Sequence, residues 1–215
     1  MKLVFISDTH GEHEELTLPE GDILFHCGDF MTDGYSVFEA KDFLEWFSNI
    51  GTFKHRILIA GNHDRLFEDI PTILLHGIDN ITYLQDSFVI IEGIKIYGTP
   101  YQPAFRNWAF NLPRDGEQLK SKWEQIPMDT DILLTHSPPY GVLDKVEEGV
   151  NVGCKMMKKR VEEVKPTIHA FGHVHECPGE EELDTHYINA AVVDRQYNCV
   201  NNPITVVFNK ERPMP

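Results

Sequence analysis

Short apolar runs, each bounded by turn-forming or polar residues, constrain the fold of this sequence more than any other feature. The runs are LVFI (3–6), DILFH (22–26), RILIA (56–60), DILLT (131–135) and TIHAF (167–171). Runs of this length are short for a helix and are typical of strands that are buried on both faces. They predict strands that other layers of the fold cover on both sides.

Two helices are predicted between these strands from apolar residues at helical spacing. The first stripe consists of Val37, Ala40, Leu44 and Phe47. The second stripe consists of Cys154, Met157, Val161 and Val164. The second helix should end near Pro166, because the residue before a proline disfavours helical backbone. Both stripes are interpreted as helix faces that pack on a core.

Other segments predict antiparallel strands. SFVIIEGIKIYGTP (87–100) contains two β-rich runs on either side of Glu92–Gly93, which is typical of a hairpin. THYINA (185–190) and PITVVF (203–208) are also strand-like, and the acidic run EEELD after Gly179 is expected to be a solvated loop. We therefore predict an α/β chain with a mixed sheet or two packed sheets. No repeat, low-complexity tract or obvious linker divides residues 1–215, so one domain is expected.

Charge and cysteine content narrow the classes of partner. The formal net charge of -15 predicts a surface that repels phosphate backbones and anionic lipid, so neither long nucleic acid nor a membrane is an expected partner. The four cysteines are scattered and form no CxxC pair, which favours free thiols in a reducing compartment. With no segment of membrane-spanning length in the sequence, we expect a cytoplasmic location.

Residues that can bind a metal ion follow each of the five predicted strands. The candidate ligands are Asp8, His10, Asp29, Asn62, His136, His173 and His175. In open α/β sheets the crevice beyond the carboxyl ends of the strands binds ligands, so these side chains are expected to converge there. Glycines beside several of them, at positions 28, 61 and 172, allow the backbone to turn tightly toward an ion.

The number and chemistry of these candidates favour two ions over one. Seven oxygen and imidazole donors are too many for one tetrahedral zinc, but they suit two ions that share a ligand such as the Asp29 carboxylate. Two metals roughly 3.5–4 Å apart stabilise the attacking and leaving oxygens of an in-line phosphoryl transfer and activate water. Mn²⁺ is favoured, and Fe, Zn²⁺ or Co²⁺ would also be accepted.

Each motif alone also has a structural explanation. The aspartate of D-T-H could cap a helix, G-D could be a turn, and the asparagine of G-N-H-D could occupy a left-handed turn position. The motifs nevertheless occur together, and each follows a predicted strand. Their joint occurrence favours a metal centre over a set of unrelated turns.

The order D-x-H, G-D, G-N-H-D, H, G-H-x-H, from Asp8 to His175, resembles the calcineurin-like metallophosphoesterase superfamily. The segments TPYQPAFRNWAFNLPR (99–114), TDILLTHSPPYGVLD (130–144) and NVGC (151–154) are similar to its small metallophosphoesterase-domain-containing members, which are related to metallophosphodiesterases. This resemblance implies a four-layer αββα fold, in which two mixed β-sheets pack as a sandwich flanked by helices.

The resemblance also implies a role for each candidate. The first metal would be bound by Asp8, His10, Asp29 and His175, and the second by Asp29, Asn62, His136 and His173. His63 would lie beside the scissile phosphate and, as an imidazolium, protonate the leaving group. Either Asp33 or Asp64 would orient His63, and the sequence does not choose between them.

The expected substrate is a small phosphodiester, with cyclic nucleotides among the candidates. Protein serine/threonine phosphatases of the superfamily have two arginines near G-D and G-N-H that bind a phosphomonoester dianion, whereas Gly34 and Ala60 stand in the matching stretches here. The alternatives are a phosphomonoesterase that acts on small molecules and, less favoured, a non-catalytic scaffold.

The aromatic segment 101–110 is the candidate substrate-binding region. Arg106, Asn107 and Trp108 could contact the substrate, or the segment could be an ordered loop anchored by its aromatic residues. His13, close after D-T-H, is expected to be an exposed polar histidine.

Overall fold

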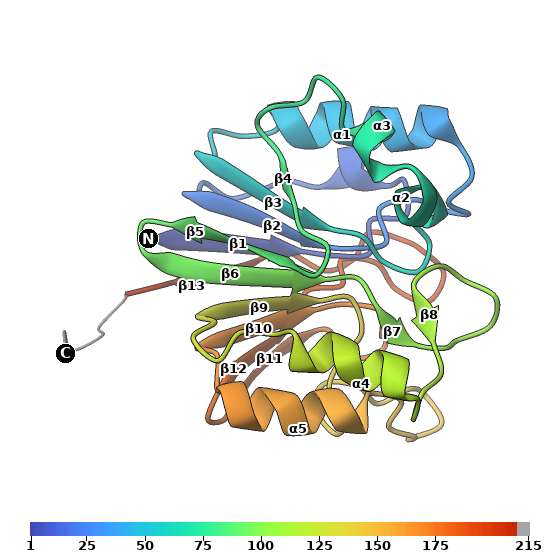
Figure 1. The fold of residues 1–215 in the computed structure, drawn as a ribbon. Helices are drawn as coiled ribbons and strands as arrows, with labels where there is room; N and C mark the ends of the chain where they lie inside the picture. The colour runs from blue at the N-terminus through green and yellow to red at the C-terminus, as the bar shows by residue number, and fades with distance from the viewer. Residues whose placement is uncertain (210–215) are drawn as a thin grey trace.

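A computed structural model describes residues 1–209 of the chain, so residues 210–215 of the predicted domain lie outside the described part. The first sheet has five strands (Figure 1). Their order is β13 (Ile204–Val207), β1 (Lys2–Ile6), β2 (Ile23–Cys27), β3 (His55–Ile59) and β4 (Thr82–Tyr83). Strands β1 to β4 are parallel and β13 is antiparallel, so the sheet is mixed.

The second sheet has six strands. Their order is β11 (Gly179–Glu182), β12 (His186–Asn189), β10 (Ile168–Phe171), β9 (Ile132–Thr135), β6 (Ile94–Thr99) and β5 (Ser87–Ile91). The four central strands are parallel and both edge strands are antiparallel. A separate short pair consists of β7 (Gln102–Pro103) and β8 (Asn111–Leu112).

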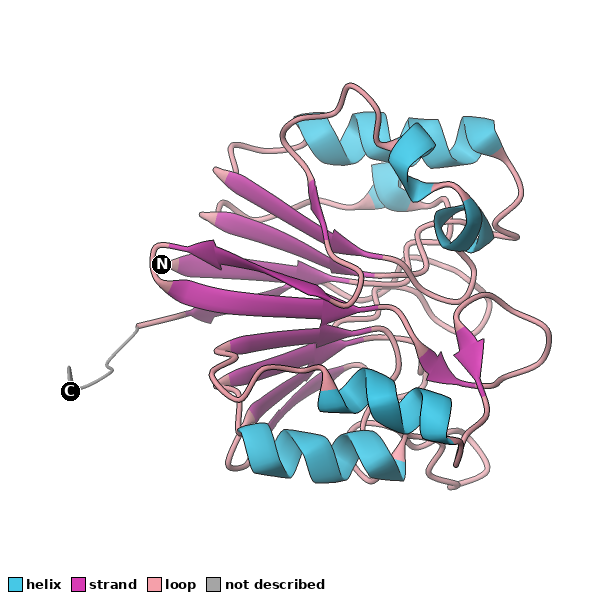
Figure 2. Ribbon diagram, viewed as in Figure 1, coloured by secondary structure: helices cyan, strands magenta, loops and turns pink. Residues whose placement is uncertain are grey.

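Helices cover the outer faces of both sheets (Figure 2). The helices are η1 (His13–Glu15), α1 (Val37–Asn49), α2 (Arg65–Asp69), α3 (Pro71–Leu74), α4 (Glu117–Glu124) and α5 (Lys155–Val164). Helices α1 to α3 lie against the five-stranded sheet, and α4 and α5 lie against the six-stranded sheet (Figure 1). The predicted four-layer sandwich is confirmed.

The alternation of side chains along each strand explains the layers. Phe5 and Phe25 of the first sheet face Ile96 and Leu134 of the second in a core between the sheets. The intervening residues point outward, so that Val4 packs with helix α1 in a second core and Leu133 packs with α4 and α5 in a third. Burying a phenylalanine or leucine side chain contributes about 1.5–3 kcal/mol, so these three clusters supply most of the stabilisation.

Most elements predicted from the sequence are present within a residue or two, and three expectations were wrong. The acidic run is partly ordered, because β11 pairs with β12 as an antiparallel edge strand. Val37 is exposed, since the buried face of α1 is shifted to Ala40, Phe43, Leu44 and Phe47. His13 is only 2% exposed, because it packs against Phe43 and Trp46 and faces the Asp42 carboxylate.

The parallel strands of both sheets end on the same side of the molecule (Figure 1). A bridge between Ser7 and Ala191 joins the ends of β1 and β12, and so connects the two sheets at this side. The loops that follow β1, β2, β3, β9 and β10 therefore meet there. Within residues 1–209, no helix is both long and apolar enough to cross a membrane.

Candidate metal centre

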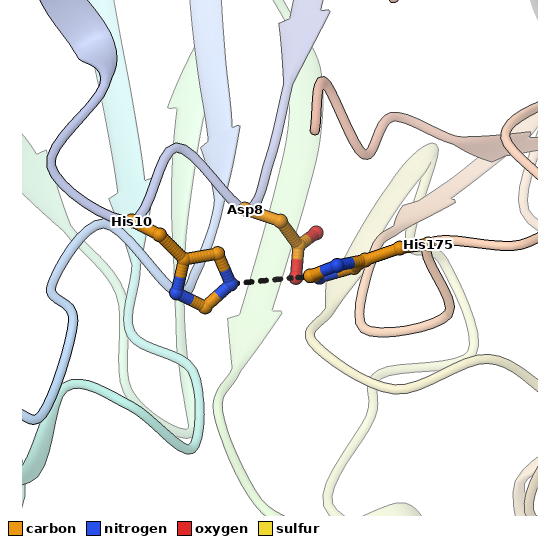
Figure 3. A group of neighbouring side chains, drawn as sticks. All are labelled: Asp8, His10 and His175. Carbon is orange, nitrogen blue, oxygen red and sulfur yellow. Dashed lines mark hydrogen bonds and ion pairs between the residues drawn. The ribbon is translucent and has the colours of Figure 1, made fainter. Parts of the chain in front are cut away.

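The first group of candidate ligands joins the loop after β1 to the loop after β10. The carboxylate of Asp8 lies between the rings of His10 and His175 (Figure 3). Asp8 Oδ1 is 3.2 Å from His175 Nε2 and 4.0 Å from His10 Nε2. One ligand atom from each residue lies within 4.8 Å of the others, which is compact enough for one cation to contact all three.

The second group joins the loops after β2, β3, β9 and β10. Asp29, His136 and His173 offer ligand atoms within 4.8 Å of one another. His136 Nε2 is 3.1 Å from Asp29 Oδ2 and 3.1 Å from Asn62 Oδ1, so Asn62 belongs to the same group.

Asp29 connects the two groups. Its Oδ2 atom is 3.8 Å from His10 Nε2 in the first group and 3.1 Å from His136 Nε2 in the second. All seven predicted ligands therefore lie in one cluster, with Asp29 between the two groups.

Backbone carbonyls orient three of the imidazole rings. His10 Nδ1 lies 3.1 Å from Met31 O, His136 Nδ1 lies 2.9 Å from Cys27 O, and His175 Nδ1 lies 3.2 Å from Asp194 O. Since a carbonyl oxygen can only accept, each Nδ1 carries a proton and donates it. The lone pair needed for metal binding is then on Nε2, which faces the carboxylates.

The cluster has an unsatisfied nitrogen that a cation would satisfy. His10 Nε2 is buried and has no hydrogen-bond partner in the described structure. Burial lowers the pKa of His10 to about 4 and that of His173 to about 3, so both rings are neutral at physiological pH. Neutral imidazoles beside two carboxylates fit divalent cations that accept mixed nitrogen and oxygen ligands.

The two aspartates are charged despite their burial. Burial alone would raise the pKa of Asp8, but the hydrogen bond and charge of His175 hold that pKa below its ordinary value. Burial opposes ionisation of Asp29 as well, but the charges of His136 and His63 lower its pKa. In turn, burial would lower the pKa of His136, but Asp29 raises that pKa to about 9. Without a metal, the protonated His136 ring thus offsets part of the carboxylate charge, and a bound cation would displace its proton.

Tight backbone turns bring the ligand loops together. Asp8, His10, Asp29 and His173 all have positive φ angles, between 43° and 69°, which are costly for residues other than glycine. The loops also approach too closely for side chains at several glycines. A Cβ atom on Gly172 would lie 1.9 Å from Asp8 Oδ2, and one on Gly61 would lie 2.3 Å from Asp29 Oδ1.

Asp64 holds two ligand loops together. Its carboxylate accepts hydrogen bonds from the N–H groups of Gly61, Asp29, Phe30 and Met31, at 2.7 to 3.1 Å. These bonds tie the loop after β3 to the loop after β2. Asp64 therefore acts on the backbone that carries Asp29 and Asn62.

The structure gives His63 partners that the sequence did not indicate. Its N–H donates to Asp29 Oδ1 at 2.7 Å, and its Nδ1 contacts the carbonyl oxygen of Thr32. Its ring stacks on Trp108, with centroids 4.0 Å apart and planes 24° apart. Neither Asp33 nor Asp64 contacts this ring in the described structure, so the proposed role of either as its orienting acid has no contact to support it.

A cavity of about 330 Å³ adjoins the cluster. Asp29, Asn62, His63, His173 and His175 line one part of it. Of the predicted substrate contacts, Arg106 and Trp108 also line it. Asn107 does not, and its carbonyl oxygen instead accepts a hydrogen bond from Arg65.

Sequence reasoning did not assign several residues of this cavity, among them Arg114, Ser137, Arg195 and Tyr197. Ser137 directly follows His136, and its hydroxyl is buried without a hydrogen-bond partner in the described structure. That adjacency was the one available signal. Arg114 ends the segment 99–114 that resembles the family, but no role was assigned to it, and Arg195 and Tyr197 lie outside every motif.

Comparison with known proteins gives results consistent with this geometry. The pattern of the family described as calcineurin-like phosphoesterase matches residues 1–177. The human and mouse proteins named metallophosphoesterase domain-containing protein 1 are each 38% identical over 231 residues, which cover 95% of this chain and 70% of the relative.

Two solved structures share the fold. The protein TT1561 of Thermus thermophilus matches with a TM-score of 0.65 and 14% identity, over 95% of this chain and 97% of its own. The phosphopantetheinyl hydrolase of Mycobacterium tuberculosis matches with a TM-score of 0.64 and 12% identity, over 100% of this chain and 98% of its own. At such low identity these two likenesses concern the fold alone.

Proposed function

Since the chain belongs to the calcineurin-like phosphoesterase family of metal-dependent phosphoesterases, we propose that it is a dinuclear phosphodiesterase that hydrolyses small phosphodiesters. The observation that carries the proposal is the joining of two ligand groups through Asp29. Two divalent cations bound there would activate a water molecule and neutralise charge on the phosphoryl oxygens. Mn²⁺ is the first ion to test.

The chain's own residues would bind these cations and handle the leaving group. Asp8, His10, Asp29 and His175 would hold one cation, and Asp29, Asn62, His136 and His173 would hold the other. His63 lines the cavity, and its Nδ1 contacts a carbonyl oxygen, so its Nε2 is free to exchange a proton. We assign it the protonation of the departing alkoxide, a step worth about 10²–10⁴-fold in rate.

The charge around the cavity supports a diester substrate. Arg195 is paired with Glu147 and Glu176, and Arg114 Nη1 donates to the carbonyl oxygens of Val152 and Gly153 at 3.0 Å. Arg106 is the remaining arginine of the lining and is exposed. The carbonyls do not neutralise Arg114, but they occupy its Nη1, and Arg106 is exposed, so neither is held ready for the bidentate contact that suits a phosphomonoester dianion. A diester carries one negative charge fewer.

The second candidate is a phosphomonoesterase that uses the same ions. The observation in its favour is that three arginines do line the cavity, and displacement of Glu147 from Arg195 would expose more charge to a substrate. A non-catalytic scaffold is less favoured, because every proposed ligand and His63 are present.

Paired assays test the proposal. Protein loaded with Mn²⁺ should hydrolyse bis-p-nitrophenyl phosphate with a larger kcat/KM than p-nitrophenyl phosphate, and a panel of cyclic nucleotides should then be screened. Chelation with EDTA should abolish the activity and added Mn²⁺ should restore it. A preference for p-nitrophenyl phosphate would favour the monoesterase. Mn²⁺-loaded protein without activity on either compound would contradict both.

A further inference from the structure

The turn from Asp194 to Asn198 is organised around one carboxylate. Asp194 Oδ1 accepts the N–H groups of Gln196 at 2.8 Å and Asn198 at 3.0 Å, and Asp194 Oδ2 accepts the side-chain amide of Asn198 at 3.0 Å. The N–H of Tyr197 also donates to Asp194 O at 3.0 Å. These bonds fix the conformation of the turn.

The turn forces Tyr197 into an unfavourable backbone conformation. Its φ angle is 64°, in the left-handed region that bulky residues avoid. The residue remains 44% exposed, so part of its ring is still open to the cavity. Strained residues of this kind cluster at active sites and at positions that hold ligands.

The turn places the Tyr197 ring against the metal centre. Its centroid is 4.7 Å from that of His10 and 5.8 Å from that of His175, with interplanar angles of 82° and 84°. The carbonyl oxygen of Asp194 also contacts Nδ1 of His175, so one residue anchors both the turn and a candidate metal ligand. The position of the ring relative to the cluster is therefore fixed.

We propose that Tyr197 is a substrate-binding residue that stacks on a planar aromatic or heteroaromatic group of the phosphoester. This inference rests on the proposed function. Tyr197 lines the cavity beside His63 and His175, where an ester group of a bound phosphate would lie. A neutral aromatic ring cannot attract the phosphate by charge, but it can stack on a flat substituent.

Tyr197 is better suited to this role than the other aromatic residues of the cavity. The Trp108 ring already stacks on His63. The Phe105 ring faces His173 with centroids 5.7 Å apart, and the Asn111 side chain holds its loop, but Phe105 itself does not have the left-handed backbone that Tyr197 has. Tyr197 also lies beyond residues 1–177, where the family pattern ends, so that pattern gives it no role.

Binding of two non-hydrolysable phosphonates tests the inference without turnover. Phenylphosphonate and methylphosphonate would be titrated into Mn²⁺-loaded protein by calorimetry. Both share the phosphonate group, so the ratio of their Kd values isolates the contribution of the aromatic ring. Stacking of an aromatic group typically changes affinity about 5- to 150-fold, and we expect tighter binding of phenylphosphonate within this range.

The variants then assign the effect to Tyr197. Tyr197→Ala should bring the ratio close to one without changing the Kd of methylphosphonate, whereas Tyr197→Phe should retain the ratio. Tyr35→Ala, at an exposed tyrosine outside the cavity lining, is the matched control and should behave as wild type. Metal content should be equal in all four proteins.

Two results would overturn the inference, and they are distinguishable. An unchanged Kd ratio in Tyr197→Ala would exclude a stacking role for Tyr197 and leave the proposed function intact. Failure of the metal-loaded wild type to bind either phosphonate or to hydrolyse either nitrophenyl ester would contradict the proposed function, and this inference with it.

Discussion

At the scale of single residues, His63 combines three contacts that fit a proton donor at the edge of a metal centre. Its backbone N–H binds the Asp29 carboxylate, its Nδ1 contacts the Thr32 carbonyl oxygen, and its ring stacks on Trp108. The ring orientation thus depends on a neutral carbonyl and an indole.

His63→Gln should lower kcat/KM in a manner that depends on the leaving group. For a diester with an alkoxide leaving group, the loss should be about 10²–10⁴-fold, because that group requires a proton as it departs. For bis-p-nitrophenyl phosphate the loss should be much smaller, because nitrophenolate leaves without protonation. Metal content measured by mass spectrometry should be unchanged. Equal losses for both substrates would instead indicate that His63 acts in binding.

At the scale of structural elements, the site depends on how closely the loops after the strands approach one another. Gly172 follows β10, and its Cα faces Asp8 and Ser7 at the end of β1. The φ angle of Gly172 is not positive, so an alanine there would meet a steric obstacle without backbone strain. A substitution at Gly172 therefore tests how closely the two loops must approach, without changing the backbone conformation that they require.

Gly172→Ala should weaken metal binding. The new Cβ would lie 1.9 Å from Asp8 Oδ2 and 2.2 Å from Ser7 Oγ, so the Asp8 carboxylate must move away from the cation. We expect Mn²⁺ affinity, measured by calorimetry, to fall at least tenfold. Gly116→Ala is the control, because its φ is -86° and its nearest contact is 3.0 Å, at a site before α4. Wild-type affinity in Gly172→Ala would show that the loops can separate freely.

Elements with local sequence signals could be predicted, and elements that depend on tertiary pairing could not. The buried strands of both sheets have apolar runs, and the polar residues after them lie together because parallel strands end at one edge. Strand β11 has the sequence GEEE and exists because β12 offers it an edge to pair with. Tyr197 and Arg195 could not be assigned to the site, since only the folded chain brings their turn to the cavity.

At the scale of the whole molecule, the candidate ligands come from both sheets. Asp8, His10 and Asp29 follow strands of the five-stranded sheet, whereas His136, His173 and His175 follow strands of the six-stranded sheet. A cation bound by both sets would hold the sheets together at this edge. Metal binding and stability should therefore be linked, because a ligand that binds only the folded state stabilises it.

Removal of the metal should lower Tm. Saturation with Mn²⁺ at 100 times its Kd would add about 2.7 kcal/mol to the free energy of unfolding, so EDTA-treated protein should melt several degrees lower. Asp29→Ala should show little or no Mn²⁺-dependent shift in Tm, because it lacks the ligand shared by both groups. Asp79→Asn, at an exposed acidic residue, should respond as wild type does. A full Mn²⁺ response in Asp29→Ala would contradict a shared ligand.

The stability of the metal-free protein should fall with decreasing pH partly because of a histidine that does not line the cavity. His169, on β10, is fully buried, and its Nε2 is 2.9 Å from Thr135 Oγ. Burial lowers its pKa from 6.5 to about 3, so the folded state keeps it neutral while the unfolded state takes up a proton below pH 6.5. The free energy of unfolding therefore carries no penalty from His169 above pH 6.5. It decreases as the pH falls from 6.5 toward 3, because only the unfolded state takes up the proton.

His169→Gln tests this linkage through the slope of the unfolding free energy against pH. The slope stays measurable even if the substitution itself destabilises the fold. Between about pH 6 and 5 the buried histidine should contribute up to about 1.4 kcal/mol per pH unit to the dependence of unfolding free energy on pH. Urea denaturation of metal-free protein across this window should therefore give a shallower slope for His169→Gln than for wild type. His76→Gln, at an exposed histidine, should leave the slope unchanged. The same slope in all three proteins would mean that His169 is protonated in the folded state, and its burial beside Thr135 would then not control its charge.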